Sequence, residues 1–265
     1  MAPTGLLTNF CYQLYAYREY LVQSVVRDLQ KKYKRSTLGY LWTMLHPLGM
    51  MGVLAIVFAN IMGVSTSDYA IFLFSGILVW NFFSSTVMMS LGSIRSNARL
   101  FSQIPIPKFL FILSLAVSNL FNFIVSLIPL AILSIIVGRD IPLTWLAFPI
   151  TILPLFCVTV GISLILATSN VFFEDTLHIS EVALQALYFL SPVLYGREHL
   201  PPWLAEILVE ANPLFRQIEF TRGVLFAGVL PSPIDYSTNL LLSVIVLLAG
   251  LWIFRRAEDK FLYFV

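Results

Sequence analysis

Two adjacent acids, Glu174 and Asp175, are the residues of this sequence best suited to move protons. They stand in a short polar stretch between two long apolar runs, and a pair of carboxyls can serve as a general acid and base. They can equally cap the helix that we expect to begin at Thr176, or pair with arginines of a partner. Because no second acid or metal motif stands near them, the structural interpretation is favoured.

The other residue types that do chemistry are scattered along the chain. Cys11 and Cys157 form neither a disulfide framework nor a Cys-x-x-Cys motif, and His46, His178 and His199 are isolated from one another. The sequence contains no phosphate-binding loop of the type G-x-x-x-x-G-K-S/T, and no arrangement of serine, histidine and acid that suggests a nucleophile. We therefore expect no catalytic residue and no metal site, and we find no means of binding ATP in this chain.

The composition favours lipid as the solvent of the folded chain. Hydrophobic residues make up 58% of the 265 residues and charged residues only 11%, whereas a soluble domain carries about 25% charged residues. A helix needs about 20 apolar residues to span a bilayer. We expect an all-α polytopic membrane protein, one domain over residues 1–265, with six transmembrane helices at 40–63, 69–92, 109–137, 147–170, 178–196 and 237–254.

The positions of the basic residues predict the orientation. With six spans, twelve of the 16 Lys and Arg residues fall on one side of the membrane. The other side holds Arg139, Arg197, Arg216 and Arg222. Because cytoplasmic loops are enriched in Lys and Arg, we expect both termini in the cytoplasm. No ionisable residue stands at the centre of a span, which argues against a proton- or ion-coupled carrier.

Two segments on the cytoplasmic side could contact a partner. Residues 14–35 repeat apolar positions at spacings of three and four, and they predict an amphipathic helix in the membrane interface, with Arg27 and Lys31 among its cations. This helix is either a generic anchor or a lever that touches a cytoplasmic partner. Residues 93–104 predict a short basic helix stopped by two prolines, which is either a docking helix or a solvated connection. Its candidate docking residues are Arg95, Asn97, Arg99, Leu100 and Phe101.

On the opposite side, residues 197–232 are too polar and too rich in proline to span the membrane. They predict two short amphipathic helices that dip into the outer leaflet. Trp203 and Leu204 belong to the first and Phe215 to the second, with Asn212 between them.

Aromatic residues make up 14% of the chain. Rings inside a membrane protein can stack on the apolar faces of sugars and let a long glycan slide past, or they can serve lipid contact and helix packing. The candidates for a substrate passage are Trp42, Trp80, Tyr188, Phe189 and Tyr195.

Several motifs, taken together, resemble the permease subunits of type-2 ABC exporters, notably those for O-antigen, capsule and teichoic acid. That family has a basic run, a Ser/Thr-x-Leu-Gly-x-Leu-Trp stretch and a proline near the start of the first span. Residues 31–47 show this pattern at Ser36, Leu38, Gly39, Leu41, Trp42 and Pro47. Further matches follow in the same order at 72–84, 190–196, 200–202 and 212–214. The turn around Glu174 departs slightly, since the family often has Arg-Asp there.

The resemblance implies an assembly and a route. Two copies of the chain would form a homodimer with two copies of an ABC ATPase, which would bind ATP and Mg²⁺, so that this chain holds no cofactor. The interface helix and the 93–104 helix would contact the ATPase. Spans one and five would line a channel between the copies, and Trp203, Leu204 and Phe215 would belong to an outer gate. The expected partner is a lipid-linked polysaccharide at the cytoplasmic (inner) membrane, with no nucleic acid involved.

Two other classes of function stay open at this point. One is an ABC-2 exporter of teichoic acid, capsule, lipid or drug. The other is a membrane-embedded enzyme that modifies lipid-linked glycans, for which Glu174 and Asp175 are the available acids.

Overall fold

The computed structural model describes residues 6–33, 39, 41–63, 65–104 and 106–264. All regular secondary structure in these ranges is helical, as the sequence predicts. The elements, in chain order, are α1 (Leu6–Ala16), α2 (Arg18–Tyr33), α3 (Leu41–Met62), α4 (Thr66–Leu91), α5 (Ser93–Ser96), α6 (Ala98–Gln103), α7 (Phe109–Val125), α8 (Leu127–Val137), η1 (Leu143–Ala147), α9 (Phe148–Phe172), α10 (Thr176–Leu190), η2 (Arg197–His199), α11 (Pro202–Ala211), α12 (Pro213–Arg222), η3 (Gly223–Ala227), α13 (Pro233–Ala257), η4 (Glu258–Lys260) and α14 (Phe261–Phe264).

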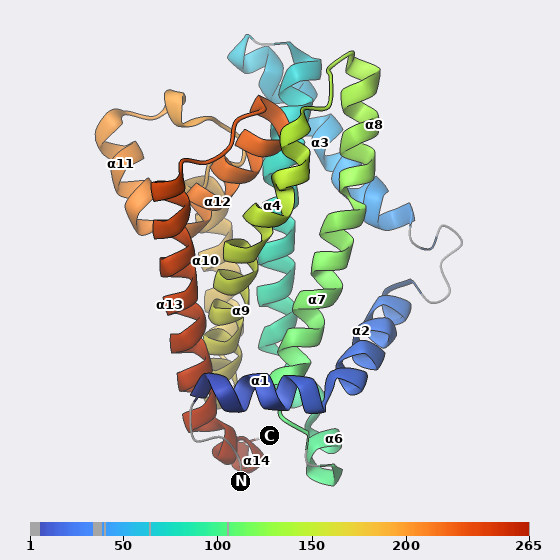
Figure 1. Cartoon of the computed structure of the whole chain (residues 1–265), viewed down its shortest axis with the longest axis vertical. Helices are drawn as coiled ribbons and strands as arrows, with labels where there is room; N and C mark the ends of the chain where they lie inside the picture. The colour runs from blue at the N-terminus through green and yellow to red at the C-terminus, as the bar shows by residue number, and fades with distance from the viewer. Residues whose placement is uncertain (1–5, 34–38, 40, 64, 105, 265) are drawn as a thin grey trace.

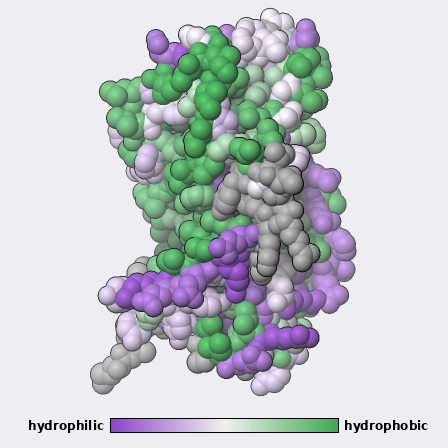
Figure 2. All heavy atoms as spheres, turned by 90° about the vertical axis from the view of Figure 1, so that its right-hand side faces the viewer, coloured by the Kyte–Doolittle hydropathy of each residue, from purple (hydrophilic) through white to green (hydrophobic). Residues whose placement is uncertain are grey.

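The long helices form an elongated bundle (Figure 1). Within the described ranges, five segments are long and apolar enough to span a membrane: Met44–Ile61, Thr66–Leu91, Phe109–Val137, Leu143–Phe172 and Pro233–Phe264. The helices α1, α6 and α14 lie at one end of the bundle, called here the terminal end. The end of α3 and the start of α4 lie at the opposite end, the far end, and α11 lies at the side of the bundle in the same half. Hydrophobic side chains cover much of the flank in Figure 2, and hydrophilic ones gather toward the terminal end.

Helix α4 is the centre of the bundle. Of its spanning window, 72% is buried, against 22% for that of α3 and 28% for that of α13. It is apolar around its whole circumference, as a helix enclosed on all sides must be, and it packs against α3, α7, α9 and α12. Helices α3 and α13 therefore leave large apolar faces that lipid or another protein chain can cover.

Helices α9 and α13 approach each other through glycines. A Cβ added at Gly250 would lie 2.4 Å from the carbonyl oxygen of Gly161, and one added at Gly161 would lie 2.6 Å from that of Val246. Small residues let helix backbones come this close inside membranes, where packing replaces the hydrophobic effect as the main driving force. The glycine pair fixes α13 against the rest of the bundle.

The span predicted at 109–137 is one apolar segment built from two helices, α7 and α8. They meet at Ser126, whose hydroxyl donates to the carbonyl of Asn122 at 2.8 Å. Pro129 has no N–H to offer the carbonyl of Val125, so the regular helical ladder is interrupted here. The proline therefore accounts for the break between α7 and α8.

The prediction of a full helical span at 178–196 is wrong in extent. The helix there, α10, has 15 residues, which at 1.5 Å per residue is about 22 Å, short of the ~30 Å hydrocarbon core. Pro192 explains the early end, because a proline disfavours helical backbone in the residue before it. Ser191 is accordingly extended, with φ −101° and ψ 147°.

The predicted interface helix, 14–35, is two helices in the structure: α1 begins earlier, and a bend separates it from α2. The ring of Phe10 on α1 lies 4.9 Å from that of Phe109, and Tyr20 on α2 meets Phe111 edge-on at 6.2 Å between centroids. Positions two apart on a helix point in nearly opposite directions. The bend therefore lets the two helices contact both sides of the base of α7. The last two residues of the predicted helix lie outside the described residues.

Candidate functional site

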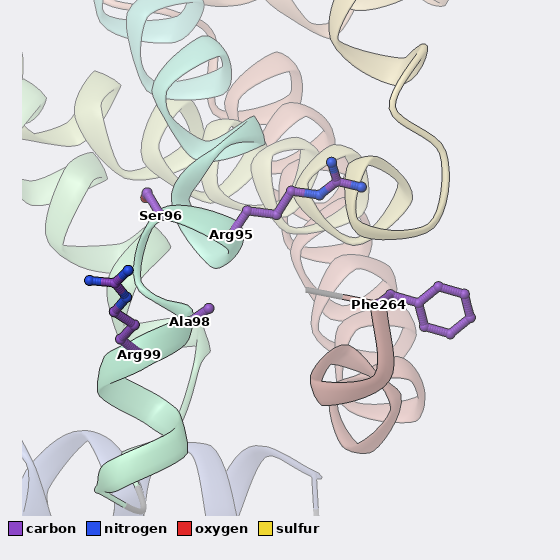
Figure 3. A pocket seen from close by; sticks show the side chains of 5 residues that line it. All are labelled: Arg95, Ser96, Ala98, Arg99 and Phe264. Atoms are coloured by element: carbon purple, nitrogen blue, oxygen red, sulfur yellow. The ribbon is translucent and has the colours of Figure 1, made fainter.

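An open hollow of about 490 Å³ lies at the terminal end. Its lining comes from the predicted docking helix and from the C-terminal helix α14, and consists of Arg95, Ser96, Ala98, Arg99 and Phe264. Figure 3 shows the two arginines pointing in different directions, with Arg95 and Phe264 extending toward one side of the view and Arg99 toward the other. The hollow thus combines two cationic side chains with one exposed aromatic ring.

Arg95 connects the docking segment to the turn that precedes α10. Its guanidinium pairs with the carboxylate of Glu174 and also donates to the carbonyl of Val171 at 3.2 Å. Asp175 occupies the N-cap position of α10 without a side-chain cap bond. The structural interpretation of the two acids is thereby supported for Glu174, although its ion partner is in the same chain and not in another subunit.

The predicted docking helix at 93–104 is bent at Asn97 into α5 and α6. The side-chain amide of Asn97 donates to the carbonyl of Ser93 at 2.8 Å, while its backbone N–H turns to Ile94 at 3.3 Å. The side chain thus takes the acceptor that a continuous helix would give to the backbone. Arg99 is exposed, Leu100 is half-buried, and Phe101 is buried beneath the ammonium of Lys108, which lies 5.4 Å from its ring centroid.

The C-terminal segment completes the terminal end, and sequence reasoning did not single it out. Lys108 donates from its backbone N–H to a Glu258 carboxylate oxygen at 3.1 Å and from Nζ to the Glu258 carbonyl at 2.8 Å. Phe264 packs on Phe172 with ring centroids 4.9 Å apart. The aromatic run FLYF after the last span was the available signal, but nothing in sequence spacing relates Phe264 to Phe172, or Glu258 to Lys108 150 positions earlier.

Of the two interface cations, Arg27 is described and the side chain of Lys31 is not. Arg27 donates to the hydroxyl of Ser24 at 2.9 Å and stays partly exposed. Its neighbour Asp28 accepts a hydrogen bond from Ser114 on α7 at 3.2 Å. The hydrogen bond between Asp28 and Ser114 therefore attaches α2 to α7, while the side chain of Arg27 stays partly exposed.

Four of the five candidate passage aromatics are brought together. Trp80 and Tyr188 meet edge to face at 5.2 Å, and Tyr188 and Phe189 do so at 5.4 Å. The hydroxyl of Tyr195 donates to the carbonyl of Phe189 at 2.7 Å. Trp80 is buried and Phe189 is 66% exposed, so the series leads from the core to the surface. Trp42 is half exposed at the start of α3, a helix that packs on α4 and α7.

The two short helices predicted within 197–232 are present as α11 and α12. Asn212 separates them, and its side-chain oxygen accepts the N–H of Leu214 at 3.0 Å as an N-cap. The three predicted gate residues have different surroundings, because Trp203 is exposed, Leu204 is half-buried and Phe215 is fully buried. Only Trp203 and Leu204 could therefore touch a passing molecule without rearrangement of the core.

Arg222 lies at the end of α12, in the far half of the bundle. From the sequence it was noted only as one of the four arginines on the side opposite the termini. It is buried, and its guanidinium lies 3.6 Å over the ring of Phe72. Burial lowers the pKa of Arg222 to about 10, with Glu219 and Glu198 acting in the opposite direction. Burial raises the pKa of Glu219. The contacts of Arg222 come from α4 and from the segment after α10, and no spacing rule relates those positions.

Comparisons with known proteins agree with this architecture. Residues 20–226 match the family model described as ABC-2 type transporter. The chain is 30% identical over 250 residues to the O-antigen export system permease protein RfbA of Myxococcus xanthus, a match that covers 94% of this chain and 96% of that protein. It is 28% identical over 245 residues to the protein of the same name from Klebsiella pneumoniae, covering 91% and 93%. It is also 25% identical over 240 residues to the polysialic acid transport protein KpsM of Escherichia coli, covering 89% and 93%. The family resemblance of the sequence motifs is confirmed, and the chain belongs to the ABC-2 type transporter family.

Proposed function

We propose that this chain is the channel-forming permease subunit of an exporter that moves a lipid-linked, O-antigen-like polysaccharide across the cytoplasmic membrane, driven by a separate ATPase. The observation that carries the proposal is the match over nearly the whole chain to permeases named for O-antigen export. The absence of a phosphate-binding loop from the sequence agrees with a division of labour, in which a partner binds ATP and Mg²⁺.

The proposed topology has six crossings, with both termini in the cytoplasm. Helices α1 and α14 lie at the same end of the bundle (Figure 1), which favours an even number of crossings. The sixth crossing would be made by α10 together with the non-helical residues 191–196. Non-helical backbone is tolerated at membrane depth where protein groups or a water-filled cavity satisfy it.

The proposed passage runs along α10. Ser180 is the one residue of this helix that is buried, although Ile179, Val182 and Phe189 are large and apolar. A helix so uncovered in a single chain supports a homodimer in which a second copy covers part of it. The exposed ring of Phe189 and the half-buried ring of Tyr188 would give a sliding glycan weak contacts, and weak contacts are required for continued movement through a pore.

The proposed docking face for the ATPase is the terminal end. The hollow lined by Arg95 and Arg99 offers cations to an acidic partner surface, and the Arg95–Glu174 pair joins this face to the start of α10. Movement of the docking segment would then reach the helix that lines the proposed passage.

Polysaccharide export is favoured over the enzyme alternative because Glu174 is paired with Arg95, which leaves Asp175 without a second acid beside it in the turn. Capsule-like polysaccharide is a second candidate substrate, since the polysialic acid transport protein is also a relative.

The test is deletion of the gene in its own host, followed by separate measurement of polysaccharide synthesis and surface display. The proposal expects lipid-linked polysaccharide to accumulate on the cytoplasmic face of the membrane while the cell surface loses it. Loss of synthesis itself would support the enzyme, and normal surface display would contradict both.

A further inference from the structure

The segment 191–196, between α10 and η2, is buried backbone without regular structure. Buried carbonyl groups outside helices need donors from elsewhere in the protein. Three consecutive carbonyls of this segment find them in side chains. Leu194 accepts from the hydroxyl of Tyr69 at 2.5 Å, Val193 from Nη2 of Arg222 at 3.2 Å, and Tyr195 from Nη1 of Arg222 at 3.5 Å.

The two donors come from two different elements. Tyr69 belongs to the first turns of α4, and Arg222 is the last residue of α12. Figure 1 shows α12 beside α4 and above α10, and both α10 and α12 contact α4. The segment is therefore held from two sides, by one hydroxyl and one guanidinium.

Arg222 has an unusual environment for a buried cation. It is 7% exposed, and the ion pairs found among the described residues do not include it. Its Nε is buried without a hydrogen-bond partner. Glu219 and Glu198 favour its charged form without forming an ion pair with it, and the groups in contact with the guanidinium are the Phe72 ring and the two carbonyls of the segment. An uncompensated buried charge is costly. The two carbonyls of the segment therefore stabilise the buried guanidinium, and the guanidinium in turn holds the segment.

Gly76 makes this contact possible. A Cβ at this position would lie 2.7 Å from Nη2 of Arg222 and 3.2 Å from the carbonyl oxygen of Val193. Because glycine has no side chain, the guanidinium of Arg222 has room to reach the carbonyl of Val193.

The bonds that hold the segment are of a kind that can be released. Carbonyls and a guanidinium exchange protein partners for water with a small net change in free energy, whereas buried apolar contacts have no such substitute. Water that enters a passage along α10 could thus take over all three bonds when the segment moves away from α4.

We propose that Arg222 and Tyr69 hold segment 191–196 against α4 and so keep the far end of the passage shut, and that release of these bonds opens it. This inference rests on the proposed function, because it assumes a passage along α10. Arg222 also holds Tyr195 through its carbonyl, and the hydroxyl of Tyr195 donates to the carbonyl of Phe189. The closed state therefore fixes the position of the exposed Phe189 ring.

The first test measures leakage from liposomes that contain this chain assembled with its ATPase, loaded with carboxyfluorescein and kept without ATP. Arg222→Gln and Tyr69→Phe should each raise the rate of dye release about tenfold or more, the factor expected for a lost charge-assisted or buried hydrogen bond. Gly76→Ala should leak as well, since it displaces the guanidinium. Arg222→Lys keeps the charge but loses the planar fork, and should leak less than Arg222→Gln.

The matched control is Arg197→Gln, which removes the same charge from an exposed side chain next to the segment. It should release dye at the wild-type rate. Wild-type retention by assembled Arg222→Gln and Tyr69→Phe complexes would overturn the proposal. If Arg222→Gln does not assemble, Tyr69→Phe decides alone, because it removes a single oxygen atom.

A second test uses a cross-link between Gly76→Cys and Val193→Cys, because a Cβ at Gly76 would lie 3.4 Å from the Cα of Val193. The cysteine displaces the Arg222 guanidinium as Gly76→Ala does, so in this variant the disulfide alone holds the segment. Oxidation should stop export and a reductant should restore it. Export by the oxidised form at the wild-type rate would overturn the opening movement. Failure of the wild-type complex to export polysaccharide in the same liposomes would instead contradict the proposed function.

Discussion

Trp80 on α4 and Tyr188 on α10 meet edge to face, with ring centroids 5.2 Å apart. The pair joins the most buried helix of the bundle to one of its most exposed. Tyr188 is in turn edge-on to Phe189, whose ring is largely exposed. The two residues of α10 are neighbours in sequence but have different surroundings, so their substitutions should have different effects.

Phe189→Ala should slow polysaccharide export without lowering stability. An aromatic contact contributes about 0.5–1.5 kcal/mol, so we expect a loss of about two- to tenfold in export rate. Tyr188→Ala should lower both export and the thermal stability of the purified chain, because its ring packs on Trp80. Ile179→Ala, also exposed on α10, is the control. An unchanged export rate for Phe189→Ala would assign that ring to lipid or subunit contact.

Exchange of the charges of Arg95 and Glu174 tests the connection at the terminal end. Arg95→Glu should reduce export because the ion pair to the turn before α10 is lost, while stability changes by only about 0–1 kcal/mol, as for other exposed pairs. Arg95→Glu combined with Glu174→Arg should recover part of the export. The readouts are export rate and co-purification of the ATPase. A double variant as poor as the single one would show that the pair itself does not matter.

Gly250→Ala should destabilise the bundle. Its new methyl group would lie 2.4 Å from the carbonyl oxygen of Gly161, and overpacking of this kind costs about 1–3 kcal/mol. The measurement is the thermal unfolding midpoint in detergent. Gly49→Ala is the control, because a Cβ there has nothing within 4 Å. Equal midpoints for the two variants would contradict the close packing of α9 and α13.

Cysteine labelling tests the orientation of the far end. In a chain with Cys11 replaced, Glu206→Cys on the exposed side of α11 should react with a membrane-impermeant reagent from outside the cytoplasmic membrane. Ala205→Cys, which is 4% exposed, should not react, and native Cys157 is buried. Labelling of Glu206→Cys only after the membrane is opened would place the far end in the cytoplasm.

The spanning segments were predictable because their signal is long and uniform. Five of the six apolar stretches correspond to segments long enough to cross a membrane. The bends were harder to predict, since each depends on a local competition. At Asn97 the side-chain amide, in place of the backbone N–H, bonds to the carbonyl of Ser93. At the end of α10, Pro192 disfavours helical backbone at Ser191 and stops the helix early. Pro192 is visible in the sequence, but the apolar run continues past it.

The contacts that build the site were less accessible to sequence reasoning. Motif resemblance placed Arg95 in a docking segment, yet its pairing with Glu174 joins positions 79 residues apart. Arg222 stood in the sequence as one of four basic residues on the far side. Only the folded bundle brings it to Phe72 and to the segment after α10.

The central claim is that this chain forms a passage and takes its energy from a separate subunit. The most direct measurement is transport of lipid-linked polysaccharide into liposomes that contain the purified chain, with and without the partner ATPase, in the presence of ATP and Mg²⁺. Transport should require both proteins, and the chain alone should hydrolyse no ATP. ATP hydrolysis by the isolated chain, or no transport by the complete complex, would contradict the account.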